Sequence, residues 1–172
     1  IKDGKIDDGD LKFSDLPPDE YDKLSLKSGD VLVIRSNGSL DIVGQAAIVS
    51  SKSVGQAFAG YLIRLRVEDT LFPNFLNYCL QSSLLRRQIV EKAHSTSGVN
   101  NINSRQIQDL EIPLPSIQDQ REIVRRIEAL FTVADRIEAS HKTLQEKIDH
   151  LPQAILSKAF RGELVPQDNN EV

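Results

Sequence analysis

The sequence contains no methionine, no tryptophan and only one cysteine, Cys79. A single cysteine excludes a disulfide within the chain and favours a reducing compartment, where thiols stay unpaired. We interpret Cys79 as a buried apolar thiol, because free cysteines are among the residues most often found in protein cores. Because the chain also lacks an initiator methionine, we expect that sequence upstream of Ile1 belongs to a longer parent chain.

Long apolar runs and export signals are absent as well. No stretch of 18 apolar residues occurs, and no charged segment followed by an apolar one precedes the first expected strand. These absences argue against a membrane span and against secretion. We therefore expect a cytoplasmic protein with no membrane partner.

The motifs that usually carry catalysis are also missing. The sequence has no phosphate-binding GxxxxGK loop, no GxGxxG fingerprint, no nucleophile elbow and no histidine pair at metal-ligand spacing. His94 opens a polar segment, where it is either solvated or in contact with a phosphate. We predict no catalytic residue, no metal site and no cofactor in this chain.

The net charge of −4 argues against a generally basic coat of the kind that binds nucleic acid without selectivity. The charge is unevenly placed, however. Residues 1–30 carry five Lys and nine Asp or Glu, whereas residues 31–116 carry eight basic and six acidic groups. The middle of the chain therefore has a small excess of positive charge.

Patterns of apolar and turn residues predict the elements of the first part of the chain. Strand-like runs occupy residues 31–35, 46–49 and 61–67. Asn37-Gly38, between the first two runs, predicts a tight hairpin. Residues 74–93 have a helical period, with Pro73 suited to the first turn. The expected apolar side of this helix, which would cover the sheet, is Phe75, Leu76, Cys79, Leu80 and Leu84.

The following segment loses this periodicity. Residues 94–103 are polar and contain a glycine, which predicts a loop. A short capped turn is expected at residues 103–110, and the prolines of residues 112–115 enforce an extended linker. Ser116 then caps a long helix, with Asp119 placed to favour the free amides of its first turn.

The long helix carries an apolar stripe whose residues alternate in steps of four and three. The stripe consists of Ile123, Ile127, Leu130, Ala134, Ile137, His141, Leu144, Ile148, Leu151 and Ile155. A mean step of 3.5 residues over more than four heptads predicts a coiled coil. The stripe is about 50 Å long at 1.5 Å per residue, too long to be buried by so small a domain, so we expect it to pair with a second helix.

Three positions within and after this helix have specific expectations. His141 lies in the stripe itself, and we interpret it as a polar residue that fixes the register of pairing. Pro152 removes a backbone donor and should kink or weaken the helix there. Arg161-Gly162 supplies a helix stop, followed by a polar tail.

Two polar segments concentrate the side chains that can read base edges and hold phosphates. We take the following as candidates for DNA contact: Arg35, Ser36, Asn37, Ser39, Thr96, Ser97, Asn100, Asn101 and Arg105. The alternative is that Ser, Asn and Gly are present because they form turns in any loop. Composition alone leaves both interpretations open.

Longer motifs point to a family. The run IPLPSIQDQREIVRRIEAL at residues 112–130, the heptad stripe and the ending LSKAFRGELVPQD at residues 156–168 resemble the second conserved region of type I restriction-modification specificity (S) subunits. The close resemblance extends over residues 104–168. Residues 29–49 and the loop SGVNNIN resemble the later part of the target recognition domain of that family. Asp119-Gln120 replaces the usual Glu-Gln of the family, a conservative difference.

This resemblance implies an α+β fold with a defined domain organisation. Residues 1–115 would form a small mixed α/β target recognition domain, incomplete at its N-terminus. Residues 116–160 would form the long coiled-coil helix, and residues 161–172 a polar C-terminal tail. In such subunits two recognition domains are separated by two long helices that pair antiparallel, so that each domain grips one half of a split DNA site. The chain would correspond to the C-terminal half of a subunit or to a natural half-subunit.

The resemblance also implies the partners. Double-stranded DNA would be read by the recognition domain, and methyltransferase (M) subunits, which use S-adenosylmethionine to methylate adenine, would dock on this chain. The restriction (R) subunit, which uses ATP and Mg, would join the complex through the M subunits. Catalysis would therefore reside in the partner subunits, and the complex would work in the cytoplasm of a prokaryote. The second coiled-coil helix would come from a homodimer or from the other half of the same subunit. The alternative is a coiled-coil adaptor whose globular domain binds protein rather than DNA.

Overall fold

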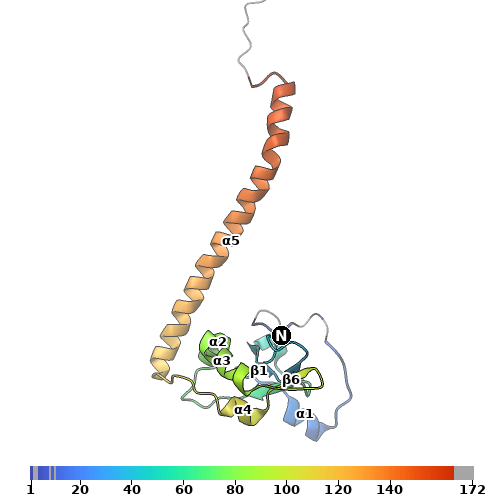
Figure 1. The fold of residues 1–172 in the computed structure, drawn as a ribbon, viewed down its shortest axis with the longest axis vertical. Helices are drawn as coiled ribbons and strands as arrows, with labels where there is room; N and C mark the ends of the chain where they lie inside the picture. The colour runs from blue at the N-terminus through green and yellow to red at the C-terminus, as the bar shows by residue number, and fades with distance from the viewer. Residues whose placement is uncertain (2–3, 8, 10, 165–172) are drawn as a thin grey trace, which may run out of the picture. The chain divides into compact units, whose positions relative to one another are not determined.

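The computed structural model describes residues 1, 4–7, 9 and 11–164. It divides into two compact units, the first spanning Ile1–Arg125 and the second beginning at Arg126. Figure 1 shows the order of the elements along the chain. The first unit contains the strands and all of the shorter helices, and the long helix α5 continues from it into the second.

An antiparallel sheet with the strand order β3-β1-β4 lies at the centre of the first unit. Its strands are β1 (Val31–Ile34), β3 (Ala46–Ile48) and β4 (Leu62–Leu65), with Leu32 opposite both Ala47 and Arg64. All four residues of β1 are buried, because this central strand is covered on both faces. The three predicted strands are therefore confirmed, with shorter bounds.

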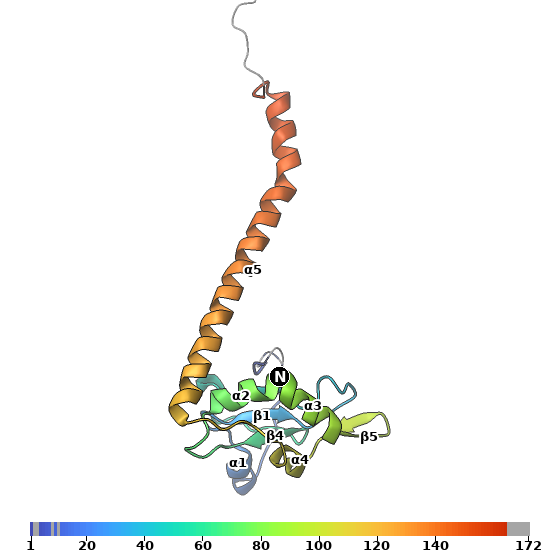
Figure 2. The same ribbon diagram turned by 60° about the vertical axis from the view of Figure 1, so that its left-hand side comes forward.

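Two helices cover one face of this sheet, as Figure 2 shows. They are α2 (Pro73–Gln81) and α3 (Ser83–Lys92), so the prediction of one helix over residues 74–93 is wrong. Ser82 has an extended backbone (ψ 152°), its hydroxyl donates to the carbonyl oxygen of Cys79, and its Oγ accepts from the N–H of Leu85. A serine that ends one helix and caps the next interrupts a continuous apolar period.

The break changes which side chains are buried. Leu84, predicted on the apolar side, is 46% exposed, whereas Leu85 is 1% exposed. Leu85 and Ile89 of α3 join Val31, Val33, Leu76 and Leu80 in the main core. The opposite face of the sheet carries a smaller core of Leu26, Leu32 and Val49, against which Ile1, Ile6, Phe58 and Leu62 pack.

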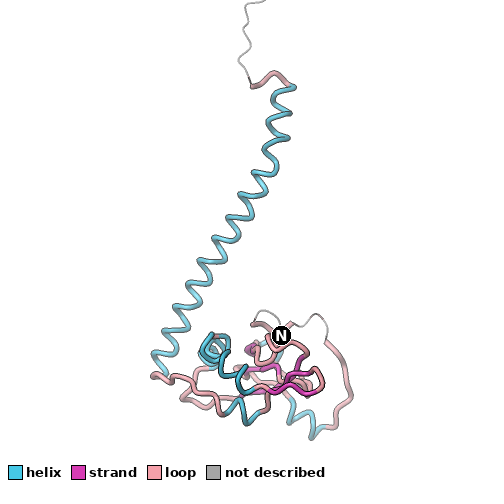
Figure 3. Tube along the Cα trace, in the orientation of Figure 1, coloured by secondary structure: helices cyan, strands magenta, loops and turns pink. Residues whose placement is uncertain are grey.

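A second sheet, with the order β2-β6-β5, was not predicted (strands are magenta in Figure 3). Its strands are β2 (Ser36–Asn37), β5 (His94–Thr96) and β6 (Val99–Asn101), so the predicted loop at residues 94–103 is largely a β-hairpin. The prediction of a tight hairpin at Asn37-Gly38 is wrong. The connection from β1 to β3 runs over residues 35–45 and contributes β2 to the other sheet, and Gly38 does not have the positive φ that such a turn requires.

The remaining short elements are α1 (Pro18–Leu24), a 3₁₀ turn at Ser51–Ser53 and α4 (Ser104–Gln108). The predicted cap of α4 is confirmed. Asn103 accepts from the N–H of Gln106, and the side chain of Gln106 accepts from the N–H of Asn103. This reciprocal pair satisfies two amides that a helix start leaves without partners.

The long helix α5 spans Ile117–Phe160. Ser116 caps it as predicted, since its Oγ accepts from the N–H of Asp119 and its hydroxyl donates to the carboxylate of the same residue. The helix continues through Pro152 without a break, and the expected local kink stays a prediction. Gly162 (φ 71°) ends the helix in a Schellman motif, in which its N–H donates to the carbonyl oxygen of Ala159 and the N–H of Glu163 donates to that of Lys158. Residues 165–172 of the expected tail lie outside the described residues.

Candidate nucleic-acid interface

The second sheet brings the two candidate segments together although they are some 60 residues apart in sequence. Ser36 lies opposite Asn101, and Asn37 lies opposite Asn100. The N–H of Ile102 also donates to the carbonyl oxygen of Arg35 at 2.9 Å. Two separately predicted loops thus form one continuous polar surface.

The strands β5 and β6 form a two-stranded ribbon with a tight turn at its tip. Ser97 (φ 51°) and Gly98 (φ 79°) connect Thr96 to Val99, which face each other across the ribbon. Two consecutive residues with positive φ match the twist of a right-handed hairpin. No heavy atom of the described chain, its two neighbours aside, lies within 4 Å of a Cβ built on Gly98, so the tip is open. Figure 2 shows the ribbon extending from the body beyond α3.

The polar side chains of this sheet do not all have the same surroundings. The Oδ1 atom of Asn37 accepts from the N–H of Ser39 at 2.9 Å, and the Nδ2 atom of Asn100 donates to the carbonyl oxygen of Gly38 at 3.0 Å. Both amides therefore hold the turn that follows β2. By contrast, the Nδ2 atom of Asn101 donates within its own strand, to the carbonyl oxygen of Val99 at 3.2 Å.

Positive charge gathers at the base of the ribbon. Arg35 immediately precedes β2, and Arg105, in the first turn of α4, follows β6; both side chains are exposed. Lys92, the last residue of α3, lies two residues before β5, and its backbone carbonyl oxygen accepts from the side chain of Gln106, in the same helix as Arg105. Lys92 was not among the predicted residues, although its place directly before the polar segment was a usable signal.

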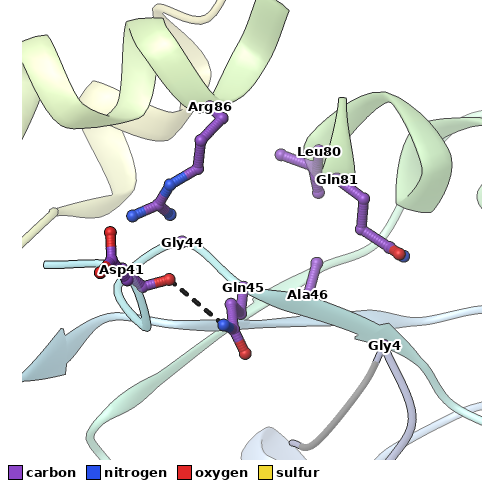
Figure 4. A pocket seen from close by; sticks show the side chains of 8 residues that line it. All are labelled: Gly4, Asp41, Gly44, Gln45, Ala46, Leu80, Gln81 and Arg86. Atoms are coloured by element: carbon purple, nitrogen blue, oxygen red, sulfur yellow. Dashed lines mark hydrogen bonds between the residues drawn. The ribbon is translucent and has the colours of Figure 1, made fainter. Parts of the chain in front are cut away.

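The connection that carries β2 is fixed from the helical side (Figure 4). The guanidinium group of Arg86 donates to the carbonyl oxygens of Leu40 and Val43, and Nε2 of Gln45 donates to the carbonyl oxygen of Asp41 at 3.2 Å. A depression of about 300 Å³ lies here, lined by Gly4, Asp41, Gly44, Gln45, Ala46, Leu80, Gln81 and Arg86. Arg86 is satisfied by backbone carbonyls, so we assign it a structural role.

An ion pair between buried Asp30 and partly exposed Arg66 joins the residue before β1 to the residue after β4. Asp30 is 1% exposed and forms two hydrogen bonds with Arg66, at 2.7 and 2.8 Å, and it accepts a third from the N–H of Lys27. Burial alone would raise the pKa of Asp30. The hydrogen bonds from Arg66 and Lys27, together with the charges of Arg66 and Arg64, outweigh burial and hold this pKa below its ordinary value.

The side chains that most often bind metal ions are scattered over the described part of the chain. No three His, Cys, Asp or Glu side chains among the described residues are placed to hold a metal ion. Burial raises the pKa of the Cys79 thiol, which keeps it protonated and a poor nucleophile. Of the helices that the structure describes, none is long and apolar enough to cross a membrane.

The apolar stripe of α5 is largely unburied within this chain. Within α5, whose residues are all described, only Gln120 and Val124 are buried. Leu130 is 70% exposed and Ile137 65%, and exposed fractions of 51–58% occur at Leu144, Ile148, Leu151 and Ile155. Ile123, Ala134 and His141 are also exposed, and Ile127 is half-buried. Pairing with a second helix through these residues stays a prediction. It requires that the stripe be exposed in the single chain, as it is here.

The chain is similar in sequence to one protein family and to several of its characterised members. Residues 3–148 match the profile of a family described as type I restriction modification DNA specificity domain. The chain is 33% identical over 168 residues to the EcoKI specificity subunit of Escherichia coli K12, and 36% identical over 168 residues to the StySPI specificity subunit of Salmonella potsdam. Each alignment covers 97% of this chain and 36% of the relative, so the chain spans about a third of their length.

Solved structures agree with this result. A chain from a structural study of complex assembly and conformational transition in the type I R-M system aligns with 82% of this chain and 33% of its own length (TM-score 0.61, 27% identity). The crystal structure of the HsdS subunit from Thermoanaerobacter tengcongensis aligns with 86% of this chain and 36% of its own (TM-score 0.64, 20% identity), a likeness of fold. The predicted α+β fold, a small mixed domain followed by one long helix, is confirmed.

Proposed function

Because the chain belongs to the type I restriction-modification DNA specificity family, we propose that it is a sequence-reading part of a specificity subunit. It directs adenine methylation and restriction by partner subunits to a bipartite DNA site. The observation that carries this proposal is the second sheet, which joins the two polar candidate segments and gathers Arg35, Lys92 and Arg105 at its base. Cations of this kind hold phosphates, and amides and hydroxyls read bases.

The long helix supplies the second half of the proposal. Its exposed stripe pairs with a second helix, from another copy or from the other half of the parent subunit, and sets the distance between two recognition domains. The unread spacer between the two half-sites then has a length fixed by the helix.

Chemistry resides in the partners of this chain. The M subunits bring S-adenosylmethionine and the R subunit brings ATP and Mg, in the cytoplasm of a prokaryotic cell. The chain itself contributes DNA selection and spacing.

Inserting four helix-forming residues after Ser140 tests the function and the spacing together. The insertion adds about 6 Å to the helix and should lengthen the preferred spacer by about two base pairs, since B-DNA rises about 3.4 Å per pair. It also introduces a local unwinding of the coiled coil, so some loss of stability accompanies the shift. Methylation mapping of the complex assembled with its M subunits measures the spacer.

The same four residues inserted after Glu163, beyond the end of α5, serve as the control and should leave the spacer unchanged. Retained activity with an unchanged spacer after the Ser140 insertion would show that the helix does not set the distance. A separate salt titration addresses the adaptor alternative. For a DNA-binding chain, the logarithm of the binding constant should fall linearly with the logarithm of the salt concentration. A protein-binding adaptor should show no duplex binding even at low salt.

A further inference from the structure

We infer that the β5–β6 ribbon enters the major groove of the DNA site with one defined face, and that His94, Asn101 and Val99 on this face determine base preference. This inference rests on the proposed function and assigns different roles to side chains that composition could not separate. It adds His94 and Val99 to the reading residues and removes Asn37 and Asn100 from them.

The strand register defines the two faces. Asn101 lies opposite Ser36 on one side and opposite His94 on the other, so these three side chains form a row across the sheet. Directly opposite residues in antiparallel strands project to the same face with Cβ atoms about 5 Å apart. Val99 stands two residues before Asn101 and shares its face. We call this set the reading face: Ser36, His94, Val99 and Asn101.

The other face differs in its hydrogen bonds and leads into the core at its base. Asn100 lies opposite Asn37 and Ser95 and shares its side of β6 with Ile102, which is fully buried in the main core. The bonds of Asn100 to Gly38 and of Asn37 to Ser39 belong to this side. These two amides position the strands, and they do not have the freedom that base recognition requires.

On the reading face, Ser36 and Asn101 are half-buried and the other two side chains are exposed. His94 is exposed, and Val99 is 42% exposed at the end of the ribbon, beside the open Gly98 turn. The long bond of Asn101 to Val99 lies within one strand, and Asn101 can exchange it for a base without disturbing the sheet. An exposed apolar side chain at the tip of a polar ribbon suits contact with a thymine methyl group.

The dimensions and charges fit a duplex. The major groove is about 12 Å wide and admits a two-stranded ribbon, and an asparagine amide pairs with the N6 and N7 edge of adenine. Arg35, Lys92 and Arg105, at the base of the ribbon, are then placed to meet the phosphates that border the groove. The tip reads bases while the base of the ribbon supplies affinity.

The experiment uses the complex assembled with M subunits and a DNA library randomised at one half-site. Asn101→Ala and His94→Ala should each reduce base preference roughly tenfold at one or two positions. Val99→Ala should do so at a position where thymine is preferred. Binding to unrelated duplexes at low salt should stay within about twofold of wild type, since no phosphate contact is removed.

Matched controls come from the other face. Asn100→Ala should lower thermal stability and Ser95→Ala should have little effect, and neither should change base preference. Arg105→Ala should weaken binding to all duplexes and leave base preference unchanged. It should also reduce the slope of log binding constant against log salt by about 1, the value expected for the loss of one phosphate contact. Circular dichroism of each variant verifies folding, and Asn101→Gln and His94→Gln provide a second pair should the alanine variants unfold.

Unchanged base preference in the Asn101 and His94 variants, or altered preference in Asn100→Ala instead, would overturn the reading face while leaving the proposed function intact. A wild-type complex that methylates without any base preference at this half-site would contradict the proposed function itself. The two failures are distinguishable because the first requires a selective wild-type complex.

Discussion

The side-chain oxygen of Gln120 accepts a hydrogen bond of 2.7 Å from the backbone N–H of Phe72. Its Nε2 atom donates to the carbonyl oxygens of Thr70 and Pro115, both at 2.9 Å, and the residue has no exposed surface. The guanidinium carbon of Arg121 lies 4.8 Å from the centroid of the Phe72 ring. One buried amide thus joins the linker before α5 to the segment that begins α2.

Gln120→Ala should lower the free energy of unfolding of the first unit by about 3 kcal/mol, because it removes the three side-chain hydrogen bonds of a fully buried amide, each worth about 1 kcal/mol. Gln118→Ala, an exposed glutamine in the same turn, is the matched control and should change stability by less than about 0.5 kcal/mol. Gln120→Glu keeps the acceptor for Phe72 but loses both donors, so it should also destabilise. Equal stabilities of the two alanine variants would contradict this role.

Urea unfolding followed by tyrosine fluorescence is suited to this comparison. The three tyrosines all lie in the first unit and the chain has no tryptophan, so the signal reports that unit alone.

The ion pair between buried Asp30 and partly exposed Arg66 predicts a pH dependence of stability. The folded-state pKa of Asp30 is below its ordinary value, so its contribution is fully present above the unfolded-state pKa of about 3.9 and is lost as the pH falls below that value. Asp30→Asn should cost about 2 kcal/mol at pH 7 and distinctly less near pH 3. Urea midpoints across this range measure the difference.

Asp69→Asn, which changes an exposed carboxylate, is the control and should leave the pH profile close to that of wild type. A constant penalty for Asp30→Asn from pH 7 to pH 3 would mean that the ion pair does not carry the acid sensitivity.

Local sequence patterns predicted the structure correctly where a residue forms hydrogen bonds with its close neighbours in the chain. Asn103 and Ser116 cap helices that follow within three residues, and their side chains and backbone partners are adjacent in the chain. The strands of the central sheet are apolar runs whose burial depends on composition alone. The caps are predicted because their hydrogen bonds span only a few residues, whereas the strands are predicted from their apolar runs although their pairing partners are distant in sequence.

Interactions between segments that are distant in sequence could not be predicted in this way. Asn37-Gly38 has the composition of a tight turn, but β6 pairs with Ser36 and Asn37, and the tight turn forms at Ser97-Gly98 instead. The break at Ser82 depends on burying Leu85 against the sheet. The hydrogen-bond partners of buried Gln120 and Asp30 lie 36 to 50 residues away, apart from Pro115 and Lys27, so no local pattern points to them.

Gly44 is required by both its conformation and its neighbours. Its φ is +82°, and a Cβ built on it would lie 2.6 Å from Cγ2 of Ile89. Gly44→Ala should therefore destabilise the first unit by about 2–4 kcal/mol through backbone strain and overpacking. Gly60→Ala is the control, because its φ is not positive and no heavy atom among the described residues beyond its chain neighbours lies within 4 Å of its Cβ position. Similar urea midpoints for both variants would contradict the assignment.

The exposed stripe of α5 predicts self-association of the isolated chain, most simply as an antiparallel pair of helices. Ile137 and Leu144 are 65% and 58% exposed, one heptad apart near the middle of the stripe. Ile137→Asp combined with Leu144→Asp should give monomers, because two carboxylates would otherwise be buried without partners in the paired seam. Sedimentation equilibrium over a range of concentrations measures the association.

The control combines Thr132→Asp with Ala139→Asp, which adds the same charge with the same spacing on the opposite side of the helix. This variant should associate like wild type, since its new carboxylates stay in solvent. Circular dichroism should show reduced helix content in the stripe variant alone, because an unpaired helix with an exposed apolar stripe loses the packing that stabilises it. A wild-type chain that sediments as a monomer at high concentration would remove helix pairing from the proposed spacing mechanism, whatever the DNA experiments show.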